Sequence, residues 1–129
     1  MKPFLLAVAL LTLAGQSAFA QDCANAQDQT TMNICAGQSY KAADAELNAT
    51  YKTLMVSVSP DGGKRLKAAQ RAWIAYRDAE CAFETLGTAD GSIHSMIVSG
   101  CLEDLTRAQT ARLNAQLNCQ EGDLSCGGQ

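Results

Sequence analysis

The feature that most constrains the fold of this chain is its set of six cysteines: Cys23, Cys35, Cys81, Cys101, Cys119 and Cys126. An even number of cysteines in a small chain is typical of a disulfide framework. A zinc site is the alternative, but the chain has no Cys-x-x-Cys pair and only one histidine, His94. Structural zinc sites need four such ligands. We therefore expect disulfide bonds and an oxidising compartment.

Residues 1–20 have the features of a secretory signal peptide. Lys2 provides a positive charge, an apolar run follows from Phe4 to Ala14, and Ala18-Phe19-Ala20 is a small-x-small cleavage site. The apolar run is shorter than the ~20 residues that a permanent membrane-spanning helix needs. We expect cleavage after Ala20 and export to the bacterial periplasm or beyond the cell.

The expected mature chain, Gln21–Gln129, has nine basic and 13 acidic side chains and a formal charge of −4. It is too acidic to be a typical nucleic-acid-binding protein. With 47% hydrophobic residues in the full chain, it is also too apolar to be disordered. A lipid anchor on Cys23 is not expected, because Gln21-Asp22 and not a small residue precedes it. No permanent membrane anchor is therefore predicted.

Apolar residues at helical spacing predict three helices and no strand. The first begins near residues 28–31, the second runs from about Lys64 to Glu84, and the third from about Leu102 to Leu117. The pattern does not settle whether residues 92–100 are helical. We predict an all-α fold, a small disulfide-stapled antiparallel three-helix domain over residues 21–118, with a glycine-rich tail at 119–129. The positions expected to face the core are Tyr40, Ala43, Leu47, Tyr51, Leu54 and Val58 in the first helix, and Leu66, Ala69, Trp73, Tyr76 and Phe83 in the second. Ala68, Ala72, Ala75 and Ala79 would let another helix approach the second closely.

Short connections make neighbouring helices antiparallel, which limits the disulfide pairing. Cys119 lies ~27 Å along a helix from Cys101, at 1.5 Å per residue, so Cys126 is its expected partner. The other four cysteines fall at one end of the bundle. Cys23–Cys35 and Cys81–Cys101 are the local pairings, and the crossed pairings stay open.

Charges are segregated along the second helix. Its first half is basic and its second half acidic, which is opposite to the preference of the helix dipole. The end of the domain with four cysteines therefore gathers carboxylates, and the other end gathers bases. The acidic residues are Asp22, Asp28, Asp78, Glu80, Glu84, Asp90, Glu103 and Asp104, and the basic ones are Lys52, Lys64, Arg65, Lys67, Arg71 and Arg112.

Catalytic signals are weak, and we predict no enzymatic activity, cofactor or metal. His94 is the only imidazole base, it falls in an expected loop, and no nucleophile motif surrounds it. The cysteines are expected to be oxidised and therefore not nucleophilic. Glu80 and Glu84 share a helix face, but that spacing is common on solvated helix surfaces. No phosphate-binding or calcium-binding loop is present.

With these features in view, the sequence resembles the exported LprI-type family of lysozyme inhibitors. The resemblance is carried by Thr31-Met32-Asn33-x-Cys35-Ala36, by Tyr40-x-x-Ala43-Asp44-x-x-Leu47-Asn48-x-x-Tyr51, and most specifically by Ala69-Gln70-Arg71-Ala72-Trp73-Ile74-x-Tyr76-Arg77-Asp78-Ala79-x-Cys81. Gly91-Ser92-Ile93 and Cys101-Leu102-x-x-Leu105-Thr106 complete it. Gln109 replaces an arginine that members commonly carry. The resemblance implies an exported, helical, disulfide-bonded protein that binds lysozyme and blocks its cleft.

An acidic end suits such a partner, because animal lysozymes are generally basic and complementary charge speeds association. We expect Asp78, Glu80 and Asp90 to steer the encounter, and His94 to enter the lysozyme cleft from a loop. Two other classes stay open: an envelope module that binds another protein, such as an immunity protein against a toxin, and a structural envelope component without a dedicated ligand.

Overall fold

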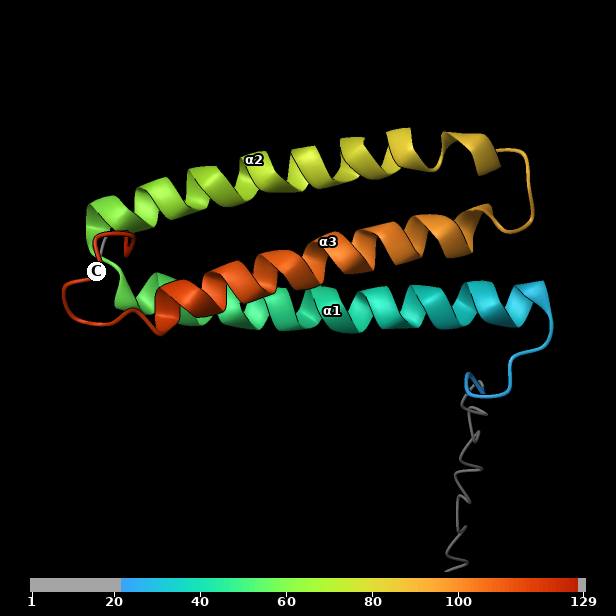
Figure 1. The fold of residues 1–129 in the computed structure, drawn as a ribbon, viewed down its shortest axis with the longest axis horizontal. Coiled ribbons are helices and arrows are strands. Elements are labelled where there is room, and N and C mark those ends of the chain that lie inside the picture. Colours follow the sequence, from blue (N-terminus) through green and yellow to red (C-terminus); the bar gives the residue numbers. More distant parts are fainter. Residues whose placement is uncertain (1–21, 128–129) are drawn as a thin grey trace, which may run out of the picture.

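The computed structural model describes residues 22–127, and the predicted signal peptide lies outside them. The described chain forms three α-helices and one short 3-10 helix: α1 Gln29–Ser57, α2 Pro60–Glu84, η1 Leu86–Thr88 and α3 His94–Leu117. Figure 1 shows α3 running antiparallel to α1, with α2 on the side of α3 away from α1. The predicted all-α, antiparallel three-helix fold with disulfide staples is confirmed.

The start of α1 follows from its capping chemistry. The Asp28 side chain accepts a hydrogen bond of 2.9 Å from the backbone N–H of Thr31, one of the donors that a helix leaves unpaired in its first turn. This bond holds the pKa of Asp28 below its usual value of 3.8, because it favours the ionised carboxylate. The start predicted near residues 28–31 is confirmed.

The second helix begins earlier than predicted. It starts at Pro60 and not at Lys64, so residues 60–63 form its first turn. Ser59 caps it by accepting from the N–H of Gly62, and proline suits the first helical position because it has no N–H to leave unpaired. The connection between α1 and α2 is therefore only two residues long.

The third helix also begins earlier, at His94 and not near Leu102. The segment that the sequence left unsettled is helical from residue 94 onward. The prediction that His94 lies in a loop is therefore wrong. His94 is the first residue of α3.

The core lies mainly between α1 and α3. Leu47, Leu54 and Leu113 are buried at its centre. Five partly buried side chains pack around them: Tyr51, Val58, Leu66, Trp73 and Leu117. The inward face predicted for α1 is thus confirmed. The face predicted for α2 is confirmed only for Leu66 and Trp73.

Most of the apolar residues of α2 face solvent. Tyr76 and Phe83 were predicted to be buried but are 54% and 75% exposed. Ala69, also predicted to be buried, is exposed. The reason is geometric: α2 buries a different stripe, containing Gln70, Arg77 and Cys81, against the rest of the bundle. The remaining alanines, Ala68, Ala72, Ala75 and Ala79, are exposed too, so they do not serve helix packing within the chain.

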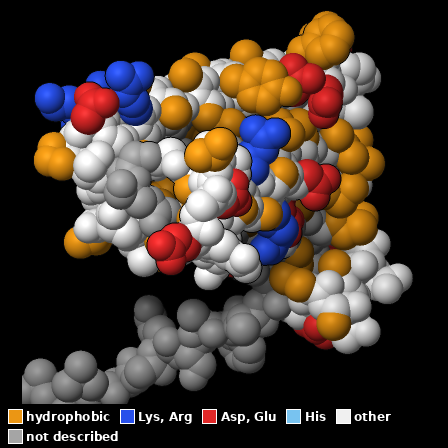
Figure 2. Space-filling model, turned by 60° about the vertical axis from the view of Figure 1, so that its left-hand side comes forward, with side chains coloured by type: hydrophobic (Ala, Val, Ile, Leu, Met, Phe, Trp, Pro, Cys, Tyr) orange, Lys and Arg blue, Asp and Glu red, His pale blue; other side chains and the backbone are white. Residues whose placement is uncertain are grey.

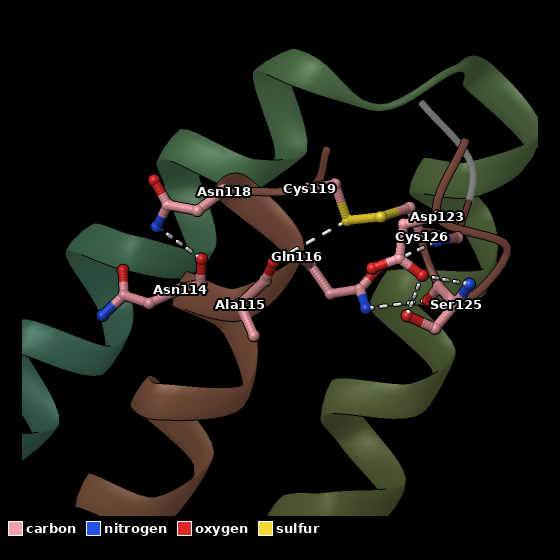
Figure 3. The surroundings of a disulfide bond; sticks show 9 residues. Asn114, Ala115, Gln116, Asn118, Cys119, Asp123, Ser125 and Cys126 are labelled. Atoms are coloured by element: carbon pink, nitrogen blue, oxygen red, sulfur yellow. Dashed lines mark hydrogen bonds between the residues drawn. A yellow bond between two sulfur atoms is a disulfide. The ribbon is translucent and has the colours of Figure 1, made fainter. Parts of the chain in front are cut away.

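The three local disulfides form, and the crossed pairings are excluded. Cys23–Cys35 ties the N-terminal segment to α1, and Cys81–Cys101 ties the end of α2 to α3. Cys119–Cys126 closes a loop in the tail. Figure 3 shows Gln116 of α3 reaching this loop, where its side chain donates to the carbonyl of Ser125 and accepts from the N–H of Gly127. The described part of the tail is thus folded back onto α3.

Candidate functional site

A groove of about 510 Å³ lies at the end of the bundle that carries the Cys81–Cys101 disulfide. It is formed where the end of α2, η1 and the beginning of α3 meet α1. Its lining is mostly apolar, with four charged or titratable side chains: Tyr40, Arg77, Asp78 and His94. The lining residues are Tyr40, Arg77, Asp78, Cys81, Ala82, Thr85, Leu86, Ala89, His94, Val98 and Leu102.

Arg77 is the polar centre beneath this groove and is only 7% exposed. Its guanidinium pairs with Asp78 at 2.8 Å and with Asp44 of α1 at 3.5 Å. It also donates to the hydroxyl of Thr106, on α3, at 3.4 Å. A buried guanidinium requires such partners, because an unpaired charge in the interior is strongly unfavourable. One side chain of α2 thereby connects all three helices.

Two aromatic rings complete the environment of Arg77. Its guanidinium carbon lies 5.6 Å from the ring centre of Tyr40 and 5.2 Å from that of Trp73, within the range of cation–π attraction. Burial raises the pKa of the Tyr40 phenol above its usual value of 10.0, and the positive charge of Arg77 opposes this rise. Tyr40 and Arg77 thus contact each other in the lining of the groove, and Trp73 packs against Arg77 from outside that lining.

The α2–α3 connection, residues 85–93, forms one wall of the groove and is held by hydrogen bonds of its own. The hydroxyl of Thr85 donates to the carbonyl of Cys81, and the hydroxyl of Thr88 donates to the carbonyl of Thr85. The N–H of Gly91 donates to the carbonyl of Thr88. Leu86 nevertheless leaves its side chain 69% exposed. The connection is thus an ordered segment that presents an apolar side chain.

The structure brings together two of the four predicted contact residues. His94 and Asp78 both line the groove. Glu80, on α2, and Asp90, in the connection, lie outside its lining. Asp90 is exposed, Glu80 is half-buried, and the Asp78 side chain is 58% exposed although it pairs with Arg77.

His94 is anchored and not free. It is half-buried, and its Nδ1 lies 2.9 Å from the hydroxyl oxygen of Thr88. Because the Thr88 hydroxyl already donates to the Thr85 carbonyl, His94 is expected to donate its Nδ1–H to Thr88. The imidazole therefore joins the start of α3 to the connection.

The predicted segregation of charge follows from the antiparallel topology, since the end of α2 and the start of α3 meet at one end of the molecule. In Figure 2 a group of Lys and Arg side chains lies at the upper left, and acidic side chains among hydrophobic ones lie at the upper right. The groove opens at the acidic end.

A second groove, of about 460 Å³, lies at the opposite end of the bundle. Leu54, Val58 and Leu66 line its apolar part, and Gln116 and Gly127 border it where the tail folds back. None of the predicted contact residues lines it.

Sequence reasoning did not identify Arg77 as the organising residue of the site. Arginine is seldom fully buried, so the residue type alone gives no reason to place Arg77 in the interior. A usable signal was present: in the buried stripe of α2, Arg77 follows Gln70 by seven residues and precedes Cys81 by four. Thr106, fully buried on α3, was also missed, because threonine is mostly exposed in folded proteins.

Across residues 22–127, no cluster of three or more His, Cys, Asp or Glu side chains is placed to hold a metal ion. The same part of the chain contains no helix with the length and apolar character needed to span a membrane.

Comparison with known proteins agrees with this architecture. The family model described as Lysozyme inhibitor LprI matches residues 21–113. An uncharacterized protein of Rhizobium meliloti (strain 1021) is 41% identical over 113 residues, covering 78% of this chain and 81% of the relative. No solved structure matches.

Proposed function

The chain belongs to the LprI family of lysozyme inhibitors, and from this premise we propose that it binds a basic, wall-degrading lysozyme and blocks its active-site cleft. In this proposal it acts as an exported protein in the periplasm or outside the cell, by binding and not by catalysis. The observation that carries the proposal is the coincidence, at one end of the bundle, of the acidic residues, the apolar groove and the ordered connection.

Charge is the first element of the proposed binding. Asp90 and Glu84 are exposed at the end of the molecule where the groove opens, and Asp78 is partly exposed at the groove itself. Carboxylates gathered at one end attract a basic partner and orient it during the encounter. The bases in the first half of α2, Lys64, Arg65 and Lys67, lie toward the other end, so the acidic end would face the partner.

The α2–α3 connection is the element that we propose enters the cleft. It lies between the ends of two helices that the Cys81–Cys101 disulfide joins, and its own hydrogen bonds order it. An ordered segment loses little conformational entropy on binding. Exposed Leu86 offers apolar area, and exposed Asp90 offers a carboxylate.

The role we propose for His94 differs from insertion into the cleft. To reach outward, the half-buried imidazole would have to give up its contact with Thr88. We propose that His94 lines the contact surface and supports the connection. Replacing it with alanine would then weaken inhibition by loosening residues 85–93.

The proposal is tested by association kinetics of the mature, oxidised protein with an animal lysozyme at several salt concentrations. The triple variant Asp78→Asn, Glu80→Gln and Asp90→Asn is expected to associate about 3–10-fold more slowly at low salt and to show a flatter salt dependence. The double variant Glu80→Gln and Asp90→Asn leaves both carboxylate partners of Arg77, Asp44 and Asp78, in place. It is expected to associate more slowly than the wild type, by a smaller factor than the triple variant.

The matched control neutralises three bases at the opposite end: Lys64→Gln, Arg65→Gln and Lys67→Gln. These changes should leave association with lysozyme as fast as in the wild type, or faster, because they remove positive charge. Association rates that are unchanged in both acidic-end variants would contradict the proposed role of the acidic end.

A further inference from the structure

The outer face of α2 is an apolar surface that nothing in the described chain covers. Tyr76 and Phe83 lie seven residues apart and expose more than half of their side chains. Exposed alanines at helical spacing extend the same face: Ala68, Ala69, Ala72, Ala75 and Ala79. In Figure 2 hydrophobic side chains reach the surface along the upper edge, where α2 lies. Large exposed apolar surfaces on a small domain commonly mark interaction sites.

The two halves of this face carry side chains of different size. Toward the start of α2 its apolar residues are all alanines, up to Ala72, and toward the end it carries the aromatic rings of Tyr76 and Phe83. The charges have the same asymmetry. Lys64, Arg65, Lys67 and Arg71 precede Ala72, whereas Asp78, Glu80 and Glu84 follow Tyr76.

We propose that α2 pairs with α2 of a second copy of this chain, antiparallel, about a two-fold axis near the middle of the helix. Antiparallel pairing places the aromatic half of each helix against the alanine half of the other, so large side chains meet small ones. It also places the basic half of each against the acidic half of the other. Parallel pairing would instead oppose rings to rings and like charges to like charges.

One register satisfies both kinds of complementarity. With Tyr76 of one copy against Ala72 of the other, Phe83 lies opposite Arg65 of the second copy, which allows a cation–π contact. Glu84 then comes close to the same arginine. Among residues 22–127 the ion-pair partner of Arg65 is Asp61, and both side chains are more than 70% exposed, so the guanidinium can also reach a second copy.

The pairing also accounts for the charge order of α2. Asp61 in the first turn suits the helix dipole, but the bases that follow it and Glu84 in the last turn oppose the dipole. The same order is self-complementary in an antiparallel dimer, since each half meets the opposite charge. The interaction between two copies therefore supplies a physical reason for an arrangement that the single chain disfavours.

The test is the molar mass of the full mature, oxidised protein in solution, measured by analytical ultracentrifugation from about 1 µM to about 500 µM. We expect a monomer–dimer equilibrium with a dissociation constant in the micromolar range, as for a small two-helix interface. Ala72→Glu should weaken dimerisation at least about 30-fold, because it places a charge in the middle of the apolar face. Ala49→Glu, at an exposed position of α1, is the matched control and should leave the equilibrium unchanged.

Charge exchange tests the antiparallel arrangement itself. Arg65→Glu and Glu84→Arg each suit the helix dipole, so neither should unfold α2, yet each should weaken the dimer. Combined in one chain they restore opposite charges across the axis, and dimerisation should recover. A protein that stays monomeric at every concentration would overturn the proposal. So would a dimer that Ala72→Glu leaves intact or that the double exchange fails to restore. The mass measurement involves no lysozyme, so its outcome is independent of the proposed inhibition.

Discussion

At the scale of single residues, Arg77 contributes most to the cohesion of the bundle, because its guanidinium contacts α1 and α3 from α2. We predict that Arg77→Met lowers the free energy of unfolding by about 2–3 kcal/mol. The loss should stay below that of a fully buried ion pair, since the partner carboxylates of Asp44 and Asp78 are partly exposed and can be solvated.

Arg77→Lys should lower the free energy of unfolding by about 1–2 kcal/mol, because lysine keeps the positive charge but has neither the planar group that packs on the rings nor the forked donors. Denaturant unfolding of the oxidised protein measures both losses, with the exposed Arg112→Lys as control. If Arg77→Met unfolded like that control, Arg77 would not be the polar centre described above.

Asp28 makes stability depend on pH at the beginning of α1. Its pKa is lowered in the folded protein by the hydrogen bond from Thr31, so its stabilisation is fully present above the unfolded value of 3.8 and is lost as the pH falls through the folded pKa. Asp28→Asn keeps a capping acceptor without a titrating group. We predict that, as the pH is lowered from 5 to 2, the thermal unfolding temperature falls less steeply in Asp28→Asn than in the wild type. Parallel curves would contradict this role.

At the scale of the elements, two disulfides should differ in their effect on function. Replacing Cys81 and Cys101 with alanine opens a bridge with a sequence separation of 20, which is worth about 3 kcal/mol in the chain-entropy model. It also releases the ends of α2 and α3 beside the connection. We predict that lysozyme inhibition is lost under conditions where circular dichroism still shows a folded helical protein.

The matched variant replaces Cys119 and Cys126. Their bridge has a sequence separation of seven and lies in the tail, at the opposite end of α3 from the groove. Opening it should lower the free energy of unfolding by about 2 kcal/mol. Inhibition should persist in this variant. Equal loss of inhibition in the two variants would show that general stability, and not the connection, governs binding.

The elements also show how far sequence reasoning reached. Helix number and order and the Cys119–Cys126 pair followed from apolar spacing, short connections and the reach along a helix. The pairing of the other four cysteines stayed open, because short connections bring all four to one end of the bundle. The starts of α2 and α3 did not follow, since Pro60 and Gly62 are read as turn residues unless the cap at Ser59 is recognised. The α3 start lacks a side-chain cap, because the side chain of Ile93, which precedes it, cannot accept a hydrogen bond.

The face of α2 was misjudged for a reason that concerns the whole molecule. Apolar spacing identifies which residues share a helix face but not whether the chain itself covers that face. In α2 the buried stripe is partly polar, with Gln70 and Arg77, and the exposed one is apolar. Gln70 is satisfied by an amide hydrogen bond from Gln109, a pairing that sequence spacing does not reveal.

At the scale of the whole molecule, antiparallel helices turn local charge order into two oppositely charged ends. The site lies at one end, where the connection, the groove and the carboxylates meet. Lysozyme contact at this end and pairing along the outer face of α2 both involve the carboxylates of α2 but use different apolar side chains. Substitutions of those apolar side chains can therefore disrupt each interaction separately. His94 and Leu86 belong to the first surface, and Ala72 and Tyr76 to the second.

The central claim, inhibition of lysozyme by the folded protein, is tested most directly by lysis of a cell-wall suspension followed by turbidity. The mature, oxidised protein is titrated against several lysozyme types, with the reduced and alkylated protein as control. The account predicts that the oxidised protein slows lysis in proportion to its concentration and that the reduced form does not. Unimpeded lysis by every lysozyme at molar excess of the oxidised protein would contradict the account.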